Sequence, residues 1–180
     1  MTTGRWVVGG GAVVVLAASA AWVVRPADVD DRLWAQVRPA IEARLVAASQ
    51  GTGYGESVPR LDAHWFCEAE ALELDERDGV VRAGVDTFCV EYGVRAASLV
   101  ECSSSRFPQV VRLKRGADGG YRVLTREEPP DGEGYARWTS SHFGHFAVSE
   151  LGGAAPEPTA LEAAARTHFG LPADAPVSPC

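Results

Sequence analysis

The sequence predicts an α+β fold, with one N-terminal transmembrane helix, then an amphipathic helix packed on a curved four-stranded antiparallel sheet, and helices at the C-terminal end. Three observations lead to this prediction. An uncharged apolar run fills residues 6–24, an apolar stripe of helical period follows in 31–48, and apolar residues alternate with a period of two from about residue 60. A helix followed by an antiparallel meander must bury its apolar stripe against one face of the sheet.

The first element is the apolar run from Trp6 to Val24, which carries no charge. As a helix it extends about 28 Å, close to the thickness of a bilayer's hydrocarbon core. Arg5 precedes the run, whereas acidic residues soon follow Arg25, so the positive-inside rule keeps the N-terminus in the cytoplasm. We therefore expect residues 1–25 to form a single-pass anchor in a bacterial-type cell membrane, with the remaining chain outside.

A cleaved signal peptide is the alternative, because Ala18-Ser19-Ala20 offers the small residues that a signal peptidase accepts. The apolar run continues past that site to Val24, which favours an uncleaved anchor. Cleavage would make the protein secreted. Both interpretations export residues 26–180.

The second element is an amphipathic helix over residues 31–48, and Asp30 or Asp31 can cap its start. Pro39 interrupts the pattern, because it removes one backbone donor and should kink the helix or split it into two. The apolar stripe recurs at intervals of three and four, through Leu33, Trp34, Val37, Ile41, Leu45 and Val46.

Four extended segments follow. Residues 76–80 suit a three-residue hairpin loop with Gly79 in the left-handed position, and residues 116–120 suit another such loop. We expect a break near Pro108. The strands are predicted at 62–74, 80–94, 98–114 and 120–127.

The C-terminal part reads as helices joined by linkers. A capping box of Thr159 and Glu162 begins a helix over residues 160–169, which Gly170 can end. We expect an α+β roll domain in residues 26–151, followed in residues 152–180 by a linker, this short helix and a flexible tail. An earlier helix is predicted near Gly134, with aromatic and histidine side chains at helical spacing: Tyr135, Trp138, His142, Phe143 and Phe146.

Four cysteines allow three complete pairings. If Glu76 pairs with Val80 in the first hairpin, Cys67 and Cys89 face each other directly, within disulfide distance. The two alternatives to this pair are a Cys89–Cys102 disulfide and free thiols. An exported domain makes oxidation reasonable.

Several groups of polar residues have the side chains needed for chemistry, but their patterns favour structural roles. His142 and His145, with His64, have weak metal-ligand spacing, but they flank aromatic residues at 143 and 146 that suit a core stripe. Residues 103–105 are serines, but they lack the Gly-x-Ser-x-Gly motif that surrounds a nucleophilic serine. We expect no catalytic residue, cofactor or metal. The acidic row of Glu68, Glu70 and Glu73 suggests a solvated sheet face, and the aromatic set suggests core material that can leave an apolar pocket: Trp65, Phe66, Phe88, Tyr92, Phe107 and Tyr121.

The charge balance excludes one class of partner. The chain holds 17 Lys and Arg against 24 Asp and Glu, a net charge of −7. A nucleic-acid-binding protein needs a positive face to displace phosphate counterions, so we expect no nucleic-acid partner.

One stretch carries a resemblance. Tyr121-Arg122-Val123-Leu124, leading to Pro129-Pro130-Asp131-Gly132, then Tyr135 and Phe143, resembles the end of small uncharacterised membrane-anchored or secreted proteins of Gram-positive bacteria. Those look like cystatin-like or nuclear-transport-factor-like α+β rolls, and the likeness covers about residues 30–145. The resemblance implies a fold, because such rolls serve as binding modules, assembly domains and occasionally isomerases.

The leading hypothesis is a non-catalytic extracytoplasmic module, tethered to the membrane by residues 6–24. It would bind a small apolar ligand or an envelope protein in the cleft between helix 31–48 and the sheet. The first alternative is an isomerase- or hydrolase-type enzyme that uses His64 or Glu70 in that cleft. The second is a structural subunit of an envelope complex, for which a large exposed apolar patch would be the sign.

Overall fold

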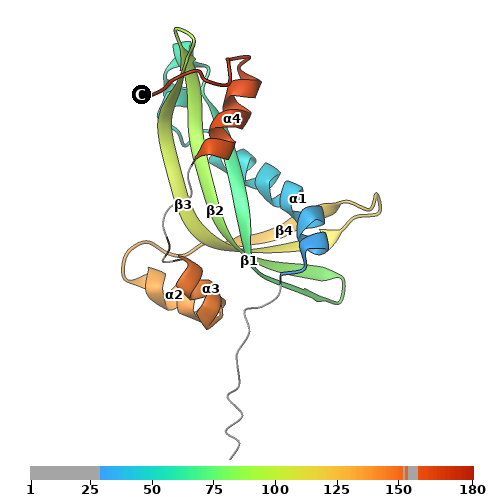
Figure 1. Ribbon diagram of the computed structural model, residues 1–180. Coiled ribbons are helices and arrows are strands. Elements are labelled where there is room, and N and C mark those ends of the chain that lie inside the picture. The colour runs from blue at the N-terminus through green and yellow to red at the C-terminus, as the bar shows by residue number, and fades with distance from the viewer. Residues whose placement is uncertain (1–28, 152, 154–157) are drawn as a thin grey trace, which may run out of the picture.

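The computed structural model describes residues 29–151, 153 and 158–180. These residues form an α+β fold with an open, mostly antiparallel sheet and four α-helices (Figure 1). The expected membrane anchor, residues 1–25, lies outside the described residues. Within the part of the chain that is described, no helix has the length and apolar character needed to cross a bilayer.

The elements follow one another as a helix, a four-stranded meander, three helices and a short last strand. The sheet order is β1-β2-β3-β4, and β5 joins the start of β3 in parallel. The bounds are α1 (Asp31–Ser49), β1 (His64–Arg77), β2 (Val80–Arg95), β3 (Ser98–Arg115), β4 (Tyr121–Glu127), α2 (Gly134–His142), α3 (His145–Leu151), α4 (Thr159–His168) and β5 (Val177–Pro179), with 3₁₀ turns at Gly55–Ser57 and Pro59–Leu61.

The helices cover both faces of the sheet, because successive side chains of a strand point to opposite faces. On β2, Val85 and Cys89 pack against α1, whereas Val90 and Tyr92 pack against α4. The α2–α3 pair packs with Val110 in a third cluster. Figure 1 shows α1 on one side of the long strands and α4 on the other.

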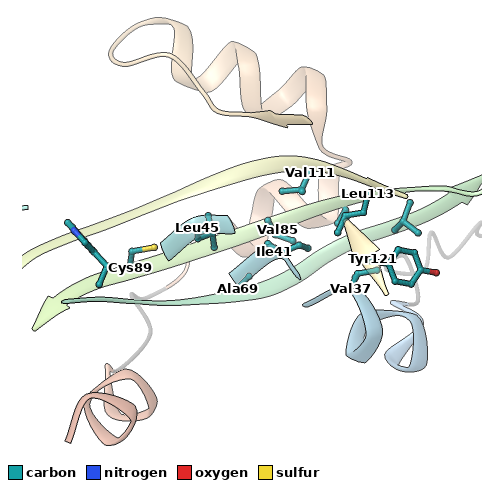
Figure 2. Close-up of a cluster of buried hydrophobic side chains, with 12 residues drawn as sticks. Val37, Ile41, Leu45, Ala69, Val85, Cys89, Val111, Leu113 and Tyr121 are labelled. Carbon is teal, nitrogen blue, oxygen red and sulfur yellow. The ribbon is translucent and has the colours of Figure 1, made fainter. Parts of the chain in front are cut away.

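Helix α1 is fixed by its cap and by one buried stripe. The Asp30 carboxylate accepts hydrogen bonds from the amides of Arg32 and Leu33, at 2.9 and 3.0 Å. Figure 2 shows the stripe against the inner faces of β2 and β3. Its members are spaced by four residues and are at most 2% exposed: Val37, Ile41 and Leu45.

Pro39 neither splits α1 nor ends it, so of the kink or split expected at this position the split is wrong. The ring lies on the exposed side of the helix. Val37 and Ile41, on either side of it, are both buried against the sheet. Packing therefore holds both halves in one helix, although the amide of Pro39 cannot donate a hydrogen bond.

The first hairpin differs from its prediction. Arg77 pairs with Val80, so the turn contains only Asp78 and Gly79, and the expected three-residue loop is wrong. Both turn residues have positive φ, 52° and 72°. A two-residue turn of this kind suits the twist of the strands that it joins.

The second hairpin keeps the expected geometry. The Gly116 amide donates to the Gly120 carbonyl at 2.7 Å, which leaves a three-residue loop. Gly119 lies in the left-handed region, with φ of 84°.

Strand β3 is continuous, so the expected break near Pro108 is absent. On its outer side β3 pairs with β5 over 99–101 and with β4 over 110–115. Pro108 lies between these two stretches, opposite Asp86 of β2. A proline is tolerated there because, among the described residues, no outer strand pairs with β3 at this position.

The C-terminal segments also differ from expectation. The helix predicted near Gly134 is two helices, since Phe143 leaves the helical conformation and buries its ring against the sheet. Thr159 is the first residue of α4 and caps nothing, so the expected capping box is wrong. Gly170 ends α4 as expected, with φ of 65°. The tail after α4, which we expected to be flexible, instead pairs with β3 through β5, and α4 itself packs on the sheet.

Candidate functional site

One disulfide joins two neighbouring strands and a second joins β3 to the residue after β5, and together they confirm the expectation of disulfide bonding. Cys67 of β1 bonds to Cys89 of β2, its direct partner in the strand register, with Cα atoms 4.1 Å apart. The second disulfide, Cys102 to Cys180, has a Cα separation of 4.7 Å and was not anticipated. Cys102 is therefore not the partner of Cys89.

A cavity of about 300 Å³ opens where α1 passes the outer edge of β1, and we call it the edge cavity. It differs from the expected apolar cleft, because the buried stripe of α1 is packed directly onto the sheet and charged side chains share the lining of the cavity. Its lining mixes two aromatic rings with charged side chains: Trp34, Arg38, Glu68, Ala69, Glu70, Asp86, Thr87 and Phe88.

Two charged residues of the edge cavity are already paired. Arg38 binds Glu42 at 2.6 Å along α1. Asp86 binds Arg106 of β3 at 2.7 Å. Glu42 also accepts a hydrogen bond from the amide of Ala69 at 3.2 Å, so the helix supplies an acceptor at the outer edge of β1.

The other two carboxylates, Glu68 and Glu70, form no ion pair with any residue that the structure describes. Burial raises the pKa of Glu68 above its ordinary value. Arg38 opposes this rise, while Glu42 and Glu70 add to it. Glu68 and Glu70 thus have no ion-pair partner among the described residues, and Arg38, the cation in the cavity lining, is already paired with Glu42.

Comparison with protein-family models, curated proteins and solved structures found no match. The site is therefore interpreted from its own geometry.

The histidines considered as metal ligands have other neighbours. The His64 ring contacts the rings of His168 and Phe169, with centroids 4.8 and 5.8 Å away. His142 stacks on Trp138 with centroids 4.2 Å apart. Among the described residues, no group of three or more His, Cys, Asp or Glu side chains could hold a metal ion.

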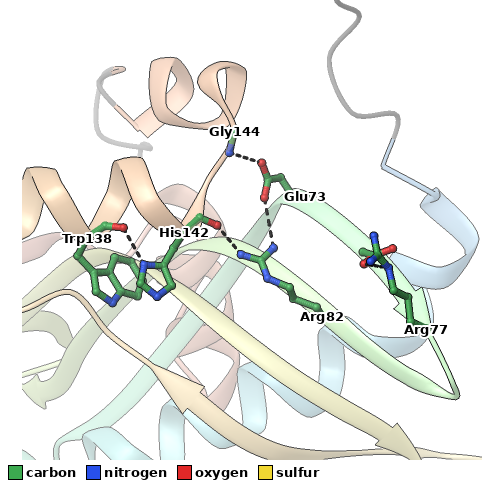
Figure 3. A network of polar contacts seen from close by, with 7 residues as sticks. Glu73, Arg77, Arg82, Trp138, His142 and Gly144 are labelled. Atoms are coloured by element: carbon green, nitrogen blue, oxygen red, sulfur yellow. Dashed lines mark hydrogen bonds and ion pairs between the residues drawn. The ribbon is translucent and has the colours of Figure 1, made fainter.

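Glu73, the third member of the acidic row, fastens the α2–α3 corner to the sheet. Its carboxylate accepts hydrogen bonds from the amide of Gly144 at 2.6 Å and from the Arg82 guanidinium at 3.3 Å. Arg82 also donates to the carbonyl of His142 (Figure 3). Its contacts give Glu73 a structural role, unlike Glu68 and Glu70.

The expected aromatic cluster is divided between the two faces of the sheet. Trp65 and Tyr121 belong to the core under α1, whereas Phe66 and Tyr92 lie under α4. Phe88 lines the edge cavity. Phe107, the sixth member, belongs to none of the three buried clusters. The sequence pattern therefore marked five of the six side chains correctly as core material, but it could not assign their faces.

Sequence reasoning missed Glu91, a fully buried carboxylate on β2. It accepts hydrogen bonds from the amides of Gly55 at 2.9 Å and Glu56 at 2.6 Å. A Cβ atom at Gly53 would lie 2.3 Å from the Glu91 carboxylate. The available signal was an acidic residue in the phase of β2 that buries Val85 and Cys89.

Ser103, in the serine stretch 103–105, also binds the glycine-rich loop that Glu91 contacts. The Ser103 hydroxyl accepts a hydrogen bond from the amide of Tyr54 at 3.0 Å. Together, Glu91 and Ser103 bind three successive amides, those of Tyr54, Gly55 and Glu56. These contacts give both side chains a structural role in seating the glycine-rich loop on the sheet.

Proposed function

We propose that the chain is a membrane-tethered extracytoplasmic binding module whose edge cavity takes a ligand with an apolar body and a positively charged group. The location rests on the charge pattern around residues 6–24 and on the two disulfides, because disulfides persist in oxidising compartments. The ligand class rests on the lining of the edge cavity.

The observation that carries the ligand class is the pair Glu68 and Glu70 beside two aromatic rings. Carboxylates without a cation attract a positive group, and aromatic faces attract cations and cover apolar atoms. Trp34 of α1 and Phe88 of β2 supply the rings. A purely apolar ligand would leave both carboxylates partly desolvated without compensation, so we propose an organic cation instead.

The enzyme hypothesis is less well supported. It relied on His64 or Glu70 within one cleft. Glu70 lines the edge cavity, but His64 packs against the end of α4. We therefore do not propose acid–base catalysis by these two residues.

Butylammonium should bind to the full chain in the edge cavity, and butanol and butyrate should bind much more weakly. Changes in NMR shifts should centre on the indole of Trp34 and on residues 68–70 and 86–88. The double variant Glu68→Gln/Glu70→Gln should weaken binding at least about tenfold, because hydrogen bonds to charged groups contribute about 1.5–3 kcal/mol each. Binding should also weaken on acidification, since Glu68, whose pKa is raised, loses its charge as the pH falls through that value.

Glu76→Gln is the matched control, because Glu76 is an exposed carboxylate on β1 outside the cavity. Equal binding of butanol and butylammonium, or full affinity in the double variant, would refute the cation proposal. The positively charged group could belong to a partner protein or to a free small molecule, and a lysine-containing tetrapeptide distinguishes these two sources. Its binding at the same site would indicate a protein partner, and its exclusion would indicate a free small molecule.

A further inference from the structure

The segment from Pro158 to Cys180, which we call the latch, is attached to the sheet at its far end. Strand β5 pairs with the start of β3 over three residues. The amide of Leu99 donates to the carbonyl of Pro176 at 2.9 Å, and the amide of Cys180 donates to the carbonyl of Glu101 at 2.8 Å. The disulfide from Cys180 to Cys102 completes this attachment.

The latch covers an apolar surface that is separate from the core under α1. Leu161 and Ala165 of α4 are buried against Val90, Tyr92 and Leu99. The polar contacts of Arg166 stay within the latch, because its guanidinium bonds Glu162 at 2.9 Å and the Ala175 carbonyl at 3.0 Å. Apolar packing, the short β5 ladder and the disulfide therefore hold the latch down.

When the latch covers this surface, one buried polar group is left without a hydrogen bond. Tyr92 is fully buried, and its hydroxyl has no hydrogen-bond partner among the described residues. A buried hydroxyl without a partner is destabilising relative to one that reaches water. Opening the latch would let water reach this hydroxyl, which favours release once the covalent attachment is gone.

The two disulfides differ in their access to a reductant. Cys89 is only 5% exposed under α1, and Cys67 is half-buried. Cys180 is exposed and Cys102 is half-buried. Thiol–disulfide exchange needs a thiolate to approach a sulfur atom, so we expect a reductant to reach the disulfide of the exposed residue Cys180 first.

We propose that the Cys102–Cys180 disulfide is a redox switch that frees the latch and uncovers the surface around Val90, Tyr92 and Leu99. A dithiol reductant supplies the two electrons. Its thiolate attacks one sulfur, the S–S bond breaks, and the released thiolate takes up a proton. The second thiol of the reductant then resolves the mixed disulfide, which leaves two cysteine thiols and an oxidised reductant. The proposal rests on the proposed location only for the cellular source of that dithiol.

The test is a graded dithiothreitol titration of the full chain in detergent, with thiol alkylation, mass spectrometry and amide hydrogen exchange. Cys102 and Cys180 should become alkylated at lower reductant than Cys67 and Cys89. In that state, exchange in 159–169 should accelerate at least tenfold, while α1 and β2 keep their protection. The variant Cys102→Ser/Cys180→Ser should show the same pattern without reductant.

The control variant Cys67→Ala/Cys89→Ala should keep α4 protected. Unchanged exchange in α4 after selective reduction would overturn the proposal, and so would reduction of both disulfides in one step with loss of protection in β2. A Cys102→Ser/Cys180→Ser variant that loses protection throughout the sheet would also overturn it. None of these readouts uses ligand binding, so the result is separate from the fate of the edge-cavity proposal.

Discussion

Replacement of Glu91 by alanine should lower the free energy of unfolding by about 3 kcal/mol, because each lost hydrogen bond to a charged group contributes about 1.5–3 kcal/mol. The variant leaves the amides of the buried Gly55 and the half-buried Glu56 without their acceptor. Urea denaturation followed by far-UV circular dichroism measures the change. Glu76→Ala removes an exposed carboxylate from the same sheet and should change stability by less than about 0.5 kcal/mol.

A double-mutant cycle with Gly53 tests the geometry of that loop. Gly53→Ala places a methyl group against the Glu91 carboxylate, so it should destabilise the natural protein. The same substitution should cost clearly less in the Glu91→Ala background, since the opposing atoms are gone. Additive effects, or a stability of Glu91→Ala within about 1 kcal/mol of the natural protein, would contradict this account of the loop.

Ile41→Ala should cost about 4 kcal/mol of unfolding free energy, within the usual range of about 2–5 kcal/mol for emptying a buried isoleucine site. Ile41 is 1% exposed and lies at the centre of the contact between α1 and the sheet. Thermal and urea denaturation both report the loss. Arg44→Ala, on the exposed side of the same helix, is the control and should change stability little.

A loss below about 1 kcal/mol for Ile41→Ala would mean that α1 does not pack on the sheet as described. Near-UV circular dichroism of the variant adds a second readout, because Trp65 and Tyr121 belong to the same core cluster.

The alternating pattern of β1 and β2 was enough to pair Cys67 with Cys89, although the predicted length of the hairpin loop was wrong. The predicted three-residue loop and the observed two-residue turn differ by one position in register. A bulge between Ala71 and Glu73 restores that position before the strands reach Cys67 and Cys89. Burial of one face fixes register strongly, so the pairing survived an error in the turn.

The role of the C-terminal segment could not be read from local pattern. Leu161 and Ala165 are spaced as a helical stripe, but a stripe does not say which surface it covers. Cys180 lies 78 residues from Cys102, and only the parallel pairing of β5 with β3 brings them together. The proline-rich composition after α4 predicted a flexible tail, whereas in the structure β5 pairs there with β3.

The candidate site was only partly visible in the sequence. The acidic row of Glu68, Glu70 and Glu73 is visible in the sequence, but its members contact different parts of the structure. Glu73 finds Arg82 and the α2–α3 corner, while Glu68 and Glu70 meet Trp34 of α1 at the edge cavity. Those partners lie far away along the chain, so period and composition could not distinguish the structural carboxylate from the two in the cavity.

The central proposal is that the folded domain lies on the extracytoplasmic side of the membrane. This location can be tested on a single side chain. Lys114 is the one lysine of the chain, and it lies exposed at the end of β3. A membrane-impermeant amine-reactive biotin reagent, applied to intact cells whose outer layers have been removed, should label Lys114 as fully as in lysed cells. Peptide mapping identifies the label, and Lys114→Arg is the control. Labelling of Lys114 only after lysis would contradict the claim.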